Sequence, residues 1–177
     1  MSDPAVARHK NLSPLDRLGF IIATGAGAGF APVAPGTFGA AEGVLLFFII
    51  NAILNNSLAL SPVWCLIWFA IINVALFAIG VWSSGRAIGV TGIKDPSVVV
   101  IDEVSGQLIA LTPLILAPSL DGIFAAFALF RFFDIFKPYP IRKLEHLRAG
   151  FGVMADDALA GIYAAALVRV GMDMNLI

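Results

Sequence analysis

The segment from Ser61 to Ser83 constrains the fold most, because it is apolar along its length and contains no charged side chain. A helix needs about 20 such residues to cross the hydrocarbon core of a bilayer. Trp64, Trp68 and Trp82 lie near its ends, as in the aromatic belts of membrane proteins. Charged residues make up only 13% of the whole chain, against about 25% in soluble domains. The sequence therefore predicts an integral membrane protein.

The succession of apolar runs predicts an all-α fold, a polytopic membrane bundle of about five helices that forms a single domain over residues 1–177. We expect the helices at 40–55, 61–83, 102–117, 120–136 and 153–172. Several are shorter than the roughly 20 residues of a full span, so their ends should lie in the headgroup region. Within the connection at 84–101, the run from Val98 to Ile101 fits either a strand or the entry to a helix.

The N-terminal part of the chain differs from these runs. Residues 1–17 are polar and are expected to form a cytoplasmic tail. Residues 18–39 are apolar but rich in Gly and Pro, which disfavour a spanning helix. We interpret them as a short helix followed by a loop at the membrane interface.

Lysines and arginines predict which ends of the helices face the cytoplasm. Most of them lie in the tail, in the 84–101 connection and in a basic loop at 137–152, whereas the turns at 55–61 and 118–121 have none. Because cytoplasmic loops are enriched in these residues, five spans place the N-terminus inside and the C-terminus outside. The net charge of −1 gives no basic excess for nucleic acid, so the expected partner is the lipid bilayer.

Acidic residues gather on the predicted cytoplasmic side. They are Asp102, Glu103, Asp134, Asp156 and Asp157. Ionisable groups at the ends of membrane segments are costly and usually functional. Four of them are expected to open helices, where the helix dipole favours a negative charge, but Asp134 is expected to close one. A hard dication with oxygen ligands, such as Mg²⁺, would relieve their repulsion, although ion pairs with Arg131, Lys94 or Lys137 remain an alternative.

Basic and small residues accompany these acids. Arg131 and Asp134 have the spacing of a helical ion pair, and Lys137 precedes Pro138, which would present it at the membrane surface to a phosphate. Gly36 and Thr37 lie before a predicted helix, where backbone N–H groups suit an anion, although Thr37 could serve only as an N-cap. Two further sets of residues also have explanations that involve no functional site. Arg142, Lys143 and Arg148 could be topology determinants alone, and Gly106, Ala160 and Gly161 could serve helix packing alone.

Four stretches in order resemble the phosphatidylglycerophosphatase A family: 25–40, 98–111, 130–146 and 150–164. The resemblance covers about residues 15–170. It implies a Mg²⁺-dependent enzyme of the bacterial inner membrane, with its site facing the cytoplasm, that removes the terminal phosphate of phosphatidylglycerophosphate to give phosphatidylglycerol. Tyr139 departs from the Trp common in the family, and Arg148-Ala149-Gly150 from a common Gly-Gly pair.

The resemblance places the family's acidic positions on the five acids and its basic position on Lys137. We expect Glu103, Asp134, Asp156 and Asp157 to bind the metal, and Asp102, Glu103, Asp134 and Asp157 to act in catalysis. Lys137, Lys94, Arg131, Gly36 and Thr37 are expected to bind the substrate phosphate. The chain has no DxDx[TV] motif of aspartyl-phosphate enzymes, which favours water as nucleophile. The alternative function is a small transporter or channel with intramembrane acids.

Overall fold

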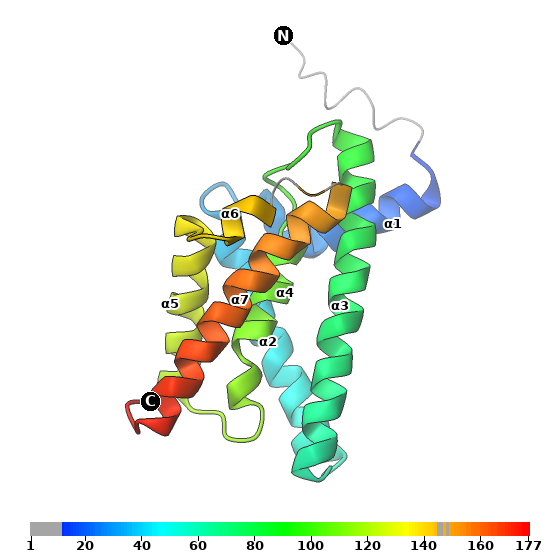
Figure 1. The fold of residues 1–177 in the computed structure, drawn as a ribbon. Coiled ribbons are helices and arrows are strands. Elements are labelled where there is room, and N and C mark those ends of the chain that lie inside the picture. Colours follow the sequence, from blue (N-terminus) through cyan, green and yellow to red (C-terminus); the bar gives the residue numbers. More distant parts are fainter. Residues whose placement is uncertain (1–11, 145–146, 148) are drawn as a thin grey trace.

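The computed structural model describes residues 12–144, 147 and 149–177. Within this part of the chain the regular elements are all helices, so the predicted all-α fold is confirmed (Figure 1). They are α1 Pro14–Ala23, η2 Gly25–Phe30, α2 Pro35–Asn51, η3 Ala52–Ser57, α3 Pro62–Thr91, α4 Ile101–Ala110, η4 Thr112–Leu114, α5 Leu120–Phe136, α6 Ile141–Leu144 and α7 Ala149–Asp173. The run at 98–101 leads into α4 and forms no strand.

Five helices run along the bundle at the predicted places, but several bounds differ. Proline at the first helical position starts α2 at Pro35 and α3 at Pro62. The third helix continues to Thr91 and ends where Gly92 adopts φ 71°, so residues 84–91 are helical rather than part of a connection. Pro113 cannot continue an α-helix, and α4 ends at Ala110. The last helix begins at Ala149, earlier than predicted.

Three of these helices are long and apolar enough to cross a membrane, at Pro35–Ser57, Pro62–Thr91 and Ala149–Asp173. The predicted spans in α4 and α5 are shorter, with 10 and 17 residues. Many large apolar side chains of the bundle are exposed, among them Phe124 and Val74, as expected for lipid-facing surfaces.

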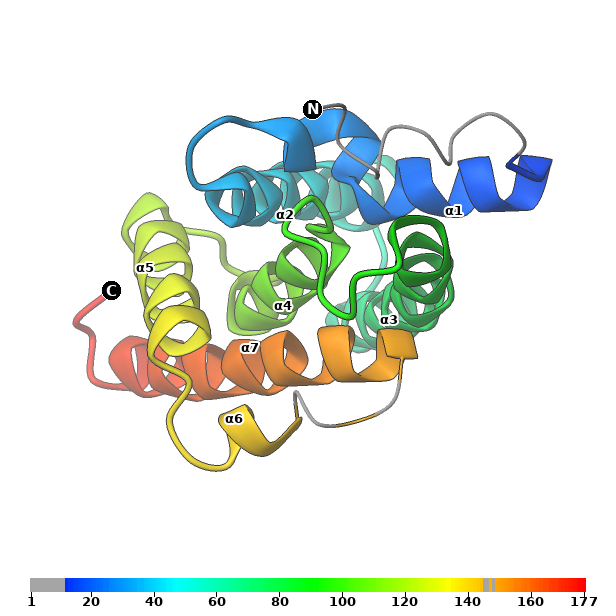
Figure 2. The ribbon, with the colours of Figure 1, turned by 90° about the horizontal axis from the view of Figure 1, so that it is seen from above.

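A short helix, α1, lies across one end of the bundle beside α3 (Figure 2). Ser13 caps its start, and the Ser13 hydroxyl donates to Asp16 Oδ2 at 2.7 Å. Arg86 Nη1 of α3 lies 2.8 Å from Asp16 Oδ1. These two hydrogen bonds, the one from Ser13 first, lower the pKa of the Asp16 carboxyl below its usual range. The predicted short helix of the interfacial segment is α1, which begins at Pro14, inside the predicted tail, and η2 follows it. Residues 35–39, predicted to be part of the loop, belong to α2.

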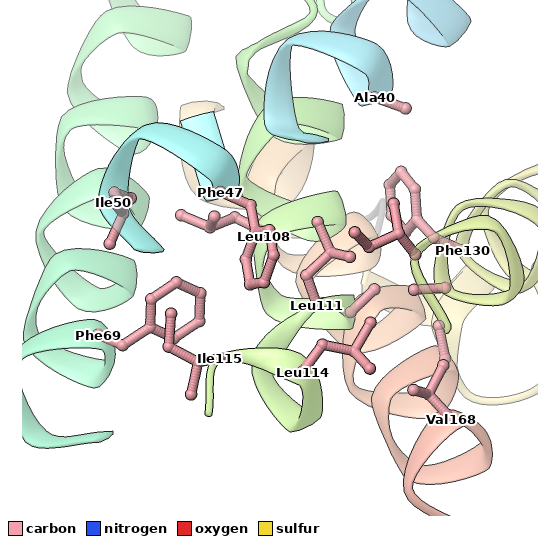
Figure 3. Packing of buried hydrophobic residues seen from close by; sticks show 14 of the residues in the cluster. Ala40, Phe47, Ile50, Phe69, Leu108, Leu111, Leu114, Ile115, Phe130 and Val168 are labelled. Carbon is pink, nitrogen blue, oxygen red and sulfur yellow. The ribbon is translucent and has the colours of Figure 1, made fainter. Parts of the chain in front are cut away.

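An apolar core between α2, α3, α4, α5 and α7 fixes how these helices cross (Figure 3). Phe47 of α2 meets Phe69 of α3 edge to face, with ring centroids 6.1 Å apart. Leu108 and Leu111 of α4 and Phe130 of α5 are fully buried in the same cluster. The core leaves the N-terminal end of α4 beside the C-terminal end of α5 and the first half of α7 (Figure 1).

Candidate active site

A polar cavity of about 270 Å³ lies at this end of the bundle. Its lining combines acidic and basic side chains from α4, α5, α7 and the connection before α4 with a few small and apolar groups. The lining residues are Pro35, Lys94, Asp95, Pro96, Ser97, Val99, Asp102, Glu103, Asp134, Lys137, Leu147, Ala149, Gly152, Val153, Asp156 and Asp157. All five predicted acids and both predicted lysines therefore meet in one place.

Three of the acids form a group that could hold a metal ion. One carboxylate oxygen each from Asp102, Glu103 and Asp157 lies within 4.8 Å of the others. Asp157 is only 3% exposed. Asp102 Oδ1, Glu103 Oε2 and Asp157 Oδ2 are buried and have no hydrogen-bond partner in the described part of the chain. Buried carboxylate oxygens left in this state repel one another and lose their hydration, and a hard dication such as Mg²⁺ would satisfy them.

The other two acids are held by cations. Arg131 Nη1 donates to Asp134 Oδ2 at 2.6 Å and lies 3.9 Å from Glu103 Oε1. Lys137 Nζ donates to Asp156 Oδ2 at 2.6 Å. Of the predicted metal ligands Glu103, Asp134, Asp156 and Asp157, two form close ion pairs, Asp134 and Asp156. The second oxygen of Asp156, Oδ1, is buried without a hydrogen-bond partner in the described part of the chain.

Close helix contacts place the carboxylates of α4 and α7 together. A Cβ atom on Gly161 would collide with the carbonyl oxygen of Gly106, and one on Gly106 would lie 2.7 Å from the carbonyl oxygen of Asp157. Only glycine permits this approach. Gly106 lies one helical turn after Glu103 on α4, and Gly161 lies one helical turn after Asp157 on α7. The small residues therefore determine the distance between the acids of the two helices.

The loop at Gly36 has a different role in the geometry from the one predicted. Gly36 belongs to α2 and packs against Glu103. A Cβ atom added at Gly36 would collide with Glu103 Oε1 and lie 3.0 Å from Arg131 Nη1. Gly36 and Arg131 are therefore not among the residues that line the cavity. Thr37 is exposed and does not line it either. The residue that caps α2 is Ala34, in the left-handed conformation with φ 48°.

Two features of the site have no clear signal in the sequence. Asp156 and Asp157 lie two turns inside α7 and not at its start, so the helix dipole has little effect on them. Ser97 lines the cavity beside Lys94, although no motif signals it beyond its position near that lysine.

The fold and the site together define a helical membrane protein with a buried carboxylate cluster in a polar cavity at one end of its bundle. The model of the family Phosphatidylglycerophosphatase A matches residues 21–172. The chain belongs to this family, and it is a phosphatase.

Curated relatives cover most of the chain. A protein of Bacteroides thetaiotaomicron named putative phosphatidylinositol-3-phosphatase is 41% identical over 85% of this chain and 91% of its own length. The phosphatidylglycerophosphatase A of Haemophilus influenzae is 39% identical over 84% of this chain and 85% of its own length. That of Escherichia coli K12 is 30% identical over 94% and 88%. No solved structure matches the chain.

Proposed function

We propose that the protein hydrolyses the terminal phosphate ester of phosphatidylglycerophosphate, giving phosphatidylglycerol and inorganic phosphate, at the cytoplasmic face of a bacterial inner membrane. The observation that carries the proposal is the group of Asp102, Glu103 and Asp157, with unpartnered buried oxygens beside two lysines in one cavity. The names of two relatives support the substrate. A cavity of about 270 Å³ has room for a headgroup phosphate, while the acyl chains stay in the bilayer.

In this proposal Asp102, Glu103 and Asp157 hold Mg²⁺. When bound, Mg²⁺ would neutralise charge on the phosphate and polarise its ester bond. Lys94 and Lys137 bind the phosphate oxygens through charge-assisted hydrogen bonds. Asp156 fixes the position of Lys137, while Arg131 orients Asp134 and Glu103.

Water is the proposed nucleophile. Its oxygen attacks phosphorus, the bond from phosphorus to the glycerol oxygen breaks, and the departing glycerol oxygen takes the proton that the attacking water gives up. Asp102 belongs to the acidic group, which would lie next to the bound phosphate, and it is proposed to accept the proton of the attacking water. The buried carboxylate oxygens at the base of the site lie in a lower dielectric than water, which strengthens these electrostatic contacts.

The test measures inorganic phosphate released from phosphatidylglycerophosphate by the detergent-solubilised protein. We expect activity with Mg²⁺, none with excess EDTA, and a loss of at least about 100-fold in Asp157→Asn and Glu103→Gln. Asp173→Asn is the matched control, because Asp173 lies on the same helix as Asp157 but is exposed and pairs with Arg169. Full turnover in both site variants would contradict the proposed site.

A second substrate is favoured by the relative from Bacteroides thetaiotaomicron, whose name specifies a phosphatidylinositol 3-phosphatase. The same phosphate-release assay with phosphatidylinositol 3-phosphate distinguishes the two. A higher kcat/KM for the inositol lipid would reassign the substrate and leave the site unchanged. The transporter alternative loses support because the chain belongs to a phosphatase family.

A further inference from the structure

A second cavity of about 520 Å³ lies beside the first. It is lined by Phe136, Lys137, Pro138, Tyr139, Arg142 and Lys143, at the turn between α5 and α6 and on α6 itself. We call this the basic groove. Lys137 lines both cavities, so the basic groove begins where the acidic cavity ends.

The basic groove differs from the acidic cavity in its charge. Among the residues that the structure describes, its lining contains three cations and no carboxylate. The described residues include no ion-pair partner for Arg142 or Lys143, and both side chains are exposed. A site of this composition favours an anion and offers no ligand set for a metal ion.

The apolar part of the groove fits the surface of a bilayer. Phe136 and Tyr139 are 62% and 74% exposed. Lys143 Nζ lies 4.8 Å from the Tyr139 ring centroid and 3.4 Å from its hydroxyl, so the aromatic ring helps to hold the ammonium group in place. Aromatic rings next to lysine and arginine are typical of the headgroup level of a membrane.

We propose that the basic groove binds the phosphodiester of the phospholipid substrate while the acidic cavity takes its phosphomonoester. This inference rests on the proposed function. The two lipids suggested by the relatives' names each carry a diester and a monoester phosphate on one headgroup. A single lipid can therefore place one phosphate on each side of Lys137. Arg142 and Lys143 become specificity residues that select lipids with a diester phosphate, beyond setting membrane orientation.

The test compares the wild type with Arg142→Gln, Lys143→Gln and the double variant in mixed micelles. We expect KM for phosphatidylglycerophosphate to rise about tenfold in the double variant with kcat unchanged, because the lost contacts exist in ground and transition state alike. The inhibition constant of inorganic phosphate, which needs only the acidic cavity, should stay the same. Arg17→Gln is the matched control, an exposed arginine on α1 outside both cavities.

A binding measurement separates this inference from the proposed function. Dioctanoyl phosphatidylglycerol has the diester but no monoester, and its binding to EDTA-treated protein requires no turnover. We expect about tenfold weaker binding in the double variant and no change in Arg17→Gln. If the wild type releases no phosphate but this difference persists, the proposed function fails and the groove assignment holds.

Three results would overturn the groove assignment. The first is an unchanged KM together with unchanged phosphatidylglycerol binding in the double variant. The second is a parallel rise in the inhibition constant of inorganic phosphate, which would mean that the cations act on the acidic cavity. The third is an equal loss in Arg17→Gln, which would indicate general attraction to an anionic surface.

Discussion

Lys137 is the residue on which both cavities depend. Its ammonium group contacts Asp156, which is only 5% exposed, and its side chain lines the acidic cavity and the basic groove. It ends α5 in the left-handed conformation, with φ 43°, where glycine is usual. Strained backbone of this kind is found where the position of a side chain matters for function.

Lys137→Gln should destabilise the protein, because it leaves Asp156 buried without a counter-charge. Breaking a buried pair from one side costs roughly 3–5 kcal/mol, and we expect the lower end since Lys137 is 23% exposed in its side chain. Unfolding in detergent, followed by circular dichroism, measures the change.

The double variant Lys137→Gln/Asp156→Asn separates structure from chemistry. It should recover most of the lost stability, since both members of the Lys137–Asp156 pair are removed, but phosphate release should stay low because only one of the two proposed phosphate-binding lysines, Lys94, is left. Recovery of both would mean that Lys137 serves only as a partner for Asp156.

The same residues show how far the sequence predicts the site. Acids in an apolar chain are conspicuous, so the amino-acid sequence alone is enough to name all five. The ion pair of Arg131 with Asp134 was predicted from their helical spacing and is confirmed. The pair of Lys137 with Asp156 joins the end of α5 to α7, and no local pattern in the sequence encodes it.

At the scale of elements, the crossing of α4 and α7 sets the distance within the acidic group. Gly161→Ala should push the helices apart, since its Cβ would collide with the Gly106 carbonyl oxygen. Overpacking of this kind costs about 1–3 kcal/mol. We also expect a higher Mg²⁺ concentration for half-maximal phosphate release, because Asp157 would move away from Asp102 and Glu103.

Gly89→Ala on α3 is the matched control, because a Cβ atom there has open space around it. It should leave Mg²⁺ dependence unchanged and leave stability equal or higher, since alanine favours a helix. An unaltered Mg²⁺ dependence in Gly161→Ala would show that the α4–α7 distance does not control the site.

Element positions were predictable where the chain itself marks the ends. The bounds of α5 agree with the sequence, because Ser119 caps its start and Pro138 follows its end. The start of α7 was misplaced, since Gly150 and Gly152 suggested a loop. In the structure Gly150 packs against the backbone of Val81 on α3, so glycine there serves a helix contact. Tertiary packing, absent from local propensity, decided this boundary.

At the scale of the whole molecule, the charges distinguish the two ends. The cavity end is formed by α6, the 92–100 connection, the C-terminal end of α5 and the start of α7 (Figure 1). Together these segments carry most of the described lysines and arginines, whereas Arg169 lies toward the other end of α7. The positive-inside rule therefore predicts that the cavity faces the cytoplasm, where a lipid made on that side would reach it directly.

Cysteine labelling in intact bacterial cells tests this orientation. The native Cys65 is buried with 0% exposure, so it should not react. Ser57→Cys lies at the exposed end of η3, and we expect a membrane-impermeant maleimide to label it in intact cells. Ile93→Cys lies in the 92–100 connection, 52% exposed, and should react only after the cells are permeabilised. The opposite labelling pattern would place the cavity on the outer face of the membrane and would contradict the proposed cytoplasmic site. The cations of the cavity would then face the side on which membrane proteins have few lysines and arginines.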